Sequence, residues 1–359
     1  QVADKHKSEV KKILDEAGVG YVKIGVPTEE RHILVTKHDA TYQFGIDYLR
    51  DVWYSTSYLL DRKQSMNGCA KKRFENYKQQ PLEVVFDKSF TGKLSQFGLN
   101  PDRRTPSGIK AAIIREKGTN GEREMAYMLY LAGFDVKDVT MTDLVSGRET
   151  LEDINMVVYC GGFSNSDVLG SAKGWAGSFL FNPKAKAALD NFYAREDTLS
   201  LGVCNGCQLM MELGLITPED KKKGKMLHND SHKFESAFLG VTVPMNRSVM
   251  FGSLSGSKLG IWVAHGEGKF SLPYPEDHYN VVLKYSYDEY PGNPNGSDYS
   301  VAGIASQDGR HLAMMPHLER ACFPWENAYY PLDRKDNDQI TPWMEAFVNA
   351  RKWVEAHKK

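Results

Sequence analysis

TLSLGVCNGCQLMMELGLI, residues 198–216, joins an apolar run, a cysteine between two glycines and a second run with helical spacing. The first run has the length and composition of a buried strand, and the second has the period of a helix. Gly202 and Gly206 stand two positions to either side of Cys204, which is the spacing of a nucleophile elbow. The glycines allow a tight strand-to-helix turn. We therefore expect the Cys204 thiol to stand at a sheet edge, where a helix N-terminus favours the thiolate.

The second cysteine of this stretch leaves other chemistries open. Cys204-x-x-Cys207 is also the spacing of a thioredoxin-like redox pair, and it supplies half of the ligands of a zinc site. A redox motif of that kind usually lies near the start of a small domain, and zinc deaminases place a His-x-Glu before their Cys-x-x-Cys, the reverse of the order here. We favour a cysteine nucleophile and expect no metal site. A thiol redox or sensor protein that uses Cys204 and Cys207 is the alternative.

Strands and helices alternate on both sides of this stretch, from Gly108 onward. Apolar runs predict buried strands at residues 109–116, 136–141, 154–163 and 199–204. Helical periodicity predicts helices at 120–134, at 183–196 and from about 205. Short strand-like runs at 229–270 interrupt the pattern, and strands near 299–306 and 311–317 and a helix at 341–359 complete it. This order predicts an α/β fold with a mostly parallel sheet covered by helices on both faces.

The N-terminal part of the chain has a different organisation. Residues 4–17 have helical spacing, 21–27 and 31–37 resemble short strands, and 42–65 have the period of one or two helices. Residues 81–107 are rich in proline, glycine and polar side chains, which is typical of a linker. We expect a small α+β piece at 1–80, a linker at 81–107 and one larger domain at 108–359.

Composition excludes several classes of partner. The 359 residues include 45 Lys and Arg against 46 Asp and Glu, so no surplus of positive charge attracts nucleic acid or an anionic membrane. No run approaches the roughly 18 apolar residues of a membrane span. Five cysteines without a disulfide-scaffold spacing fit a reducing, cytoplasmic location. Because the sequence begins at Gln1 within a predicted helix, we expect a piece of a longer protein.

A cysteine nucleophile needs a base and donors for an oxyanion. His317 follows a predicted buried strand, at the sheet edge where the elbow also opens, and Glu319 could orient its imidazole. An ion pair between Glu319 and Arg320 is the simpler alternative. For the oxyanion hole, the N–H of Asn205 is one candidate, and Gly162 in the loop after the third strand is another. Together these segments supply the nucleophile, the oriented base and the oxyanion donors of an acyl-transfer site.

Four separated motifs resemble one enzyme family. They are GVCNGCQLM at 202–210, GGFSNSDVLGSAKGWA at 161–176, AHGEGKF at 264–270 and MMPHLER at 314–320. These motifs resemble the glutaminase domain of the large, single-chain phosphoribosylformylglycinamidine synthases, a class I (triad) glutamine amidotransferase of flavodoxin-like fold. The resemblance implies that Cys204 forms a γ-glutamyl thioester and that His317 and Glu319 complete the triad. It also implies that L-glutamine is held by Phe163, Gln208, His265, Gly266 and Glu267.

The resemblance extends to the N-terminal piece, which is similar to the end of the family's synthetase region. The complete enzyme is implied to be a ligase of de novo purine biosynthesis. It uses ATP and Mg²⁺ to convert formylglycinamide ribonucleotide to formylglycinamidine ribonucleotide with ammonia from glutamine. This chain has no phosphate-binding glycine loop followed by Lys-Ser/Thr, so we expect the glutaminase part alone, with no cofactor, and the missing synthetase region as its partner. A non-catalytic docking module is a further alternative, which the intact triad disfavours.

The sequence departs from the family pattern in three places. Asn165-Ser166 replace an aromatic residue and a glycine, Ala237 replaces an arginine, and Leu318 replaces a proline. The first two changes are expected to affect closure of the glutamine site. Leu318 is expected to loosen the turn between His317 and Glu319.

Overall fold

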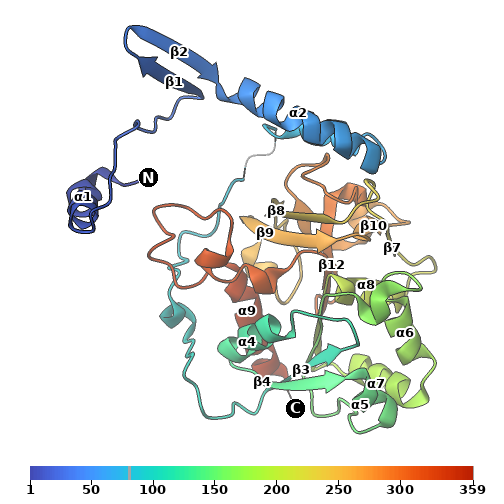
Figure 1. Ribbon diagram of the computed structural model, residues 1–359. Helices are drawn as coiled ribbons and strands as arrows, with labels where there is room; N and C mark the ends of the chain where they lie inside the picture. Colours follow the sequence, from blue (N-terminus) through green and yellow to red (C-terminus); the bar gives the residue numbers. More distant parts are fainter. Residues whose placement is uncertain (80–81, 359) are drawn as a thin grey trace. The chain divides into compact units, whose positions relative to one another are not determined.

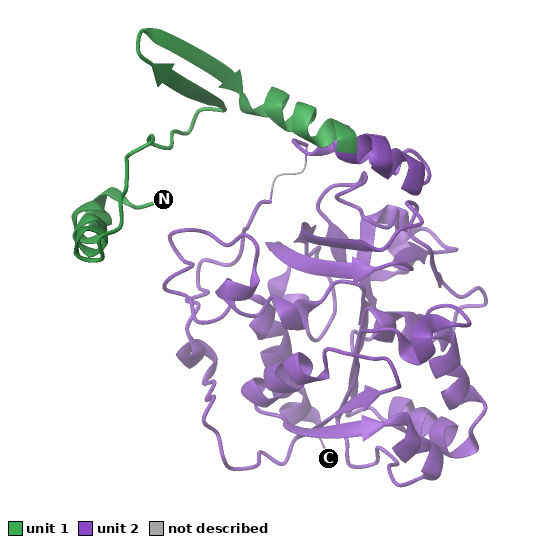
Figure 2. Ribbon diagram, viewed as in Figure 1, with its two compact units in different colours: residues 1–56 green, residues 57–359 purple. Residues whose placement is uncertain are grey.

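The computed structural model describes residues 1–79 and 82–358. The chain divides into two compact units, residues 1–56 and 57–359 (Figure 2). This division falls inside helix α2 (Ile46–Gln64). The boundary expected between the N-terminal piece and the linker, at Gln80 and Pro81, lies outside the described residues.

The first unit contains a short helix and a β-hairpin. Helix α1 (Lys7–Glu16) confirms the helix predicted at 4–17. Strand β1 (His32–Lys37) pairs antiparallel with β2 (Ala40–Gly45). The strand predicted at 21–27 is wrong, because those residues adopt no regular structure. Residues 42–45 were expected to begin a helix, yet they belong to β2, where pairing with β1 overrides the local helical period.

A nine-stranded sheet forms the centre of the second unit. Its order is β4-β3-β5-β6-β13-β12-β11-β8-β9. The parallel half consists of β3 (Lys110–Arg115), β4 (Asp135–Thr140), β5 (Met156–Tyr159), β6 (Leu199–Val203) and β13 (His311–Met314). The antiparallel half consists of β8 (Glu235–Thr242), β9 (Lys258–His265), β11 (Asn280–Tyr285) and β12 (Val301–Ala305). Strands β7 (Lys225–Leu227) and β10 (Lys269–Ser271) form a separate pair.

Helices cover both faces of the parallel half, which confirms the predicted fold class (Figure 1). On one side α4 (Glu122–Ala132) packs against α9 (Trp343–His357). The other side carries α5 (Met141–Ser146), α6 (Lys173–Leu180), α7 (Pro183–Ala194) and α8 (Asn205–Glu212). In the described ranges no helix is long and apolar enough to cross a bilayer.

Residues 82–107 have little regular structure, as their composition predicts, apart from a short turn of 3-10 helix at Leu94–Phe97. They are nevertheless attached to the second unit. Phe90 is buried, Val85 forms a bridge with Lys258, and Gln339 N–H donates to the Gly92 carbonyl over 2.7 Å. The segment therefore packs along the surface of this unit. Helix α3 (Cys69–Asn76) precedes it.

Candidate active site

Cys204 occupies the turn between β6 and α8. Its φ of 52° and ψ of −107° lie outside the regions that L-residues normally adopt, as the elbow prediction requires. The Cys204 N–H donates to the Met314 carbonyl over 2.9 Å, which ties the elbow to the end of β13. Helix α8 begins at the next residue, Asn205, so the thiol stands at a helix N-terminus.

The two glycines around Cys204 are required sterically. A Cβ on Gly202 would lie 2.5 Å from the Gly206 carbonyl oxygen, and a Cβ on Gly206 would lie 2.0 Å from the Tyr159 carbonyl oxygen. Neither position accepts a side chain without movement of the backbone. Because neither glycine carries a side chain, α8 can pack directly against the neighbouring strand β5.

His317 and Glu319 meet as the sequence predicts. The Nδ1 atom of His317 lies 2.6 Å from Oε1 of Glu319, and both side chains are buried. His317 N–H donates to the Trp262 carbonyl over 2.9 Å, which fixes this turn against β9. The alternative partner of Glu319 is also present, because Arg320 Nε lies 3.9 Å from the same oxygen. The shorter contact with His317 orients the imidazole.

The elbow and the histidine are adjacent. A Cβ on Gly161 would lie 2.8 Å from Cε1 of His317 and 3.3 Å from Cβ of Cys204. Burial alone would lower the pKa of His317, but the Glu319 carboxylate and a hydrogen bond with Cys204 raise that pKa to about 10. A protonated imidazole beside the sulfur can stabilise a thiolate and later donate its proton to a leaving amine.

A cavity of about 250 Å³ opens beside the sulfur. Its lining includes the nucleophile and six of the residues predicted around it: Cys204, Gly162, Phe163, Gln208, His265, Gly266 and Glu267. His232, Lys233 and Phe234 also line this cavity. Sequence reasoning missed Asp167, Ser171, His228 and Ala264. His317 and Glu319 are absent from this lining, since they lie buried behind the thiol.

The glycine loop after β5 approaches the elbow closely. Gly162 has a φ of 122°, and a Cβ there would lie 2.6 Å from Cα of Thr119. In the same loop, Phe163 N–H donates to Gly118 over 2.9 Å and Ser164 N–H donates to the Asn205 side chain over 3.0 Å. Because those two N–H groups are used, the glycines are the loop's candidates to face an oxyanion.

Gln208 is buried and holds the far wall of the cavity. Its side-chain oxygen accepts from Asn205 Nδ2 over 2.8 Å, and its Nε2 donates to the Glu267 carbonyl over 2.7 Å. Glu267 in turn accepts from Ser171 N–H over 3.3 Å. Both ends of the Gln208 amide are therefore engaged, and its Nε2 ties α8 to the loop at 265–268.

His265, the first residue of this loop, is buried. Asn229 Nδ2 donates to the His265 carbonyl, so Oδ1 of Asn229 is the acceptor that faces His265 Nδ1 at 3.2 Å. The Nδ1 atom therefore carries the proton, and burial lowers the pKa of His265 to about 3. Nε2 is then an unprotonated acceptor, and it has no partner among the described residues.

The redox alternative is not favoured. Cys207 is completely buried on α8, and burial raises the pKa of its thiol far above the ordinary value. All five cysteines are free. Within residues 1–79 and 82–358, no group of three or more His, Cys, Asp or Glu side chains could hold a metal ion.

The departures from the family pattern occupy distinct places. Asn165 and Ser166 have φ values of 52° and 57°, so the position expected to be glycine keeps a left-handed backbone with a serine. Leu318 is fully buried between the two triad residues. Ala237 lies on β8 and lines a separate cavity with Arg73 and Tyr77, away from Cys204.

The fold and the Cys-His-Glu arrangement define the class of protein, a glutamine amidotransferase with a cysteine at the elbow. A family model described as a CobB/CobQ-like glutamine amidotransferase domain matches residues 108–354. The chain belongs to this family.

Curated relatives are named phosphoribosylformylglycinamidine synthase. The Homo sapiens protein is 40% identical over 337 residues, which cover 85% of this chain and 24% of that protein. The probable enzyme of Arabidopsis thaliana, called chloroplastic/mitochondrial, is 40% identical over 333 residues, covering 86% and 23%. The chain thus spans about a quarter of the length of these relatives. The solved structure of PurLQS from Thermotoga maritima is 26% identical, covers 70% of this chain and 99% of that chain, and has a TM-score of 0.49.

Proposed function

We propose that this chain hydrolyses L-glutamine through a thioester on Cys204. The observation that carries the proposal is that Cys204 lines a cavity large enough for an amino acid and is adjacent to the buried His317–Glu319 pair. Glutamine enters with its side-chain amide beside the sulfur. The loop at 265–268, supported by Gln208, holds the other end of the substrate.

The reaction has two steps. The Cys204 thiolate attacks the amide carbon, and the oxyanion is stabilised by N–H groups of Gly162 and Asn205. The C–N bond breaks, His317 gives its proton to the nitrogen, and ammonia leaves a γ-glutamyl thioester. His317 then takes a proton from water, which attacks the thioester and releases glutamate and the thiolate. Glu319 keeps the imidazole oriented through both steps.

We further propose that this glutaminase is part of a phosphoribosylformylglycinamidine synthase of de novo purine biosynthesis, as the names of its relatives suggest. In that enzyme the ammonia would serve the ATP-dependent conversion of formylglycinamide ribonucleotide to the amidine. ATP and Mg²⁺ would act in the synthetase region of that enzyme. The free cysteines support a reducing, cytoplasmic location.

Trapping the thioester tests the proposal. Incubation with glutamine and hydroxylamine should yield γ-glutamyl hydroxamate with the unmodified chain and none with Cys204→Ala. Equal hydroxamate formation by the two proteins would refute a thioester on Cys204.

A further inference from the structure

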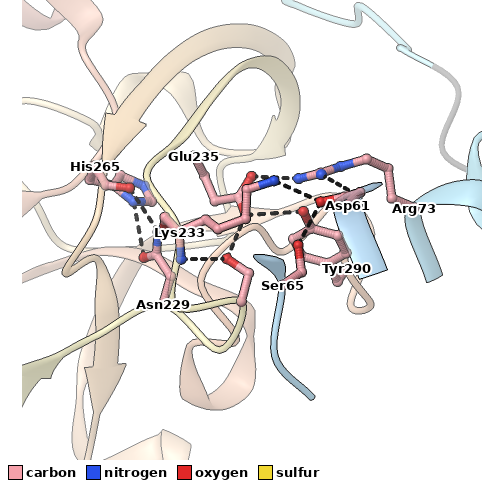
Figure 3. A network of polar contacts seen from close by, with 9 residues as sticks. Asp61, Ser65, Arg73, Asn229, Lys233, Glu235, His265 and Tyr290 are labelled. Carbon is pink, nitrogen blue, oxygen red and sulfur yellow. Dashed lines mark hydrogen bonds and ion pairs between the residues drawn. The ribbon is translucent and has the colours of Figure 1, made fainter. Parts of the chain in front are cut away.

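An ionic cluster built around two buried carboxylates joins helices α2 and α3 to the segment that forms one wall of the cavity (Figure 3). The ionic cluster consists of Asp61 on α2, Arg73 on α3, Lys233 and Glu235. Arg73 donates from Nη1 to Asp61 Oδ2 over 2.7 Å and from Nη2 to Glu235 Oε2 over 2.8 Å. Lys233 Nζ donates to Asp61 Oδ1 over 2.7 Å. Two carboxylates thus face two cations.

The two carboxylates of the ionic cluster also accept hydrogen bonds from hydroxyl groups. Asp61 and Glu235 are 6% and 7% exposed. Ser65 Oγ donates to Asp61 over 2.6 Å, and Tyr290 OH donates to Glu235 over 3.0 Å. Replacing Asp61 removes the acceptor that holds both Arg73 and Lys233, and replacing Arg73 leaves two buried carboxylates without one of their cations. A satisfied buried network is also rigid, so it fixes the segments that carry its members.

The ionic cluster continues into the cavity wall. Lys233 lines the cavity, as do its neighbours His232 and Phe234. The Lys233 carbonyl accepts from Asn229 Nδ2 over 2.9 Å, and the same nitrogen donates to the His265 carbonyl over 2.7 Å. Figure 3 shows this succession of polar contacts between Asp61 and His265. The wall at 228–234 and the loop at 265–268 are therefore held together through Asn229.

The turn between α2 and α3 adds contacts to the same wall. Met66 N–H donates to the Ser231 carbonyl over 3.0 Å, and Asn67 Nδ2 donates to the Asp230 carbonyl over 2.8 Å. Asp61 and Arg73 lie outside the residues 108–354 that the family model matches. A segment beyond the matched amidotransferase domain thus contacts one wall of its cavity directly.

We propose that Asp61 and Arg73 are positioning residues for the glutamine site, acting through Lys233 and Glu235 on the wall at 228–234. The proposal rests on the glutaminase function proposed above. Neither residue lines the cavity or contacts Cys204 or His317. Their loss should therefore weaken the hold on glutamine and leave the chemistry at the sulfur nearly unchanged.

Saturation kinetics of covalent labelling separate these two effects. The probe is a diazo-ketone analogue of glutamine that alkylates the nucleophile, and the variant is the isosteric Asp61→Asn. The half-saturating probe concentration should rise about tenfold or more, while the maximal labelling rate changes less than about threefold. Asp61→Glu should restore much of the affinity. Lys72→Met is the matched control, because Lys72 on α3 pairs with Glu289 at 3.4 Å in an exposed contact away from the cavity.

An unchanged half-saturating concentration in Asp61→Asn would overturn the proposal, as would an equal rise in Lys72→Met. A fall in the maximal rate alone would also overturn it. If Asp61→Asn does not fold, as judged by circular dichroism, Arg73→Lys tests the same prediction, because a lysine keeps the charge but cannot span both carboxylates. Absence of any Cys204 labelling in the unmodified chain would instead refute the glutaminase function itself.

Discussion

Gly206 lies so close to Tyr159 that a Cβ on the glycine would come within 2.0 Å of the tyrosine carbonyl oxygen. The start of α8 and the end of β5 are therefore in backbone contact directly beneath the nucleophile. In an isolated helix alanine is more stable than glycine by about 1 kcal/mol. At Gly206, the steric overlap of an added Cβ with the Tyr159 carbonyl should outweigh this gain in helix stability.

Gly206→Ala is therefore expected to lower the free energy of unfolding by about 3 kcal/mol. Urea denaturation followed by circular dichroism would measure the change. Gly252→Ala is the matched control, because no heavy atom lies within 4 Å of its added Cβ. Equal stability of Gly206→Ala and the unmodified chain would contradict the packing described here.

The two cysteines of the elbow region should behave differently. Cys204→Ala removes the nucleophile and should abolish glutamine hydrolysis. Cys207→Ser changes a buried thiol that faces away from the reaction, so it should retain most of the activity if the variant folds. Ammonia release from glutamine measures both variants. Loss of activity in a folded Cys207→Ser protein would favour the thiol-pair alternative.

Glu319→Gln should lower kcat by about 10²-fold or more, because the imidazole loses both its orientation and the charge that stabilises its protonated form. The pKa of His317, about 10 in the native protein, should fall in the variant. The folded pKa lies above the ordinary value of 6.5. The pair therefore stabilises the fold fully below pH 6.5, and this contribution is lost as the pH rises toward 10. NMR titration of the His317 ring would detect the change, and an unchanged pKa would exclude Glu319 as its cause.

The buried ring of His311 should make the protein less stable in acid. Burial, followed by the nearby Arg310, lowers the pKa of this ring to about 4, and its Nδ1 lies 3.0 Å from Ser200 Oγ. The folded pKa is depressed below 6.5, so the contribution to stability is present above pH 6.5 and declines as the pH falls toward 4. At 1.36 kcal/mol per pKa unit, the loss is about 3 kcal/mol.

The His311→Gln variant should lose less stability between pH 7 and pH 4 than the unmodified chain. Urea unfolding at both pH values gives the comparison, and His6→Gln on the exposed N-terminal segment serves as the control. Parallel pH profiles for His311→Gln and the unmodified chain would show that His311 does not titrate on unfolding.

Local sequence patterns predicted the parts of the site that depend on local geometry. Gly202 and Gly206 revealed the elbow because a tight turn excludes side chains at those positions. His317 and Glu319 could be found because they directly follow a buried strand. The parallel half of the sheet followed from its alternating strands and helices, and its helices α4, α7, α8 and α9 were expected close to where they lie.

Other features depend on contacts between distant residues. The β2 strand was hidden because residues 42–45 have a helical period, and only pairing with β1 reveals it. Gln208 was expected near the glutamine site, but no local pattern showed that its amide holds Glu267, 59 positions away. The contact between Asp61 and Lys233 joins residues 172 positions apart. No local pattern encodes such partners.

Peptide mapping after labelling with the diazo-ketone glutamine analogue shows directly whether Cys204 is the nucleophile that glutamine reaches. All five cysteines would be mapped by mass spectrometry, with and without excess glutamine. If Cys204 is the glutamine nucleophile, we expect a single adduct, on Cys204, and excess glutamine should prevent it. An adduct on Cys207 or another cysteine, or one on Cys204 that glutamine does not block, would contradict it.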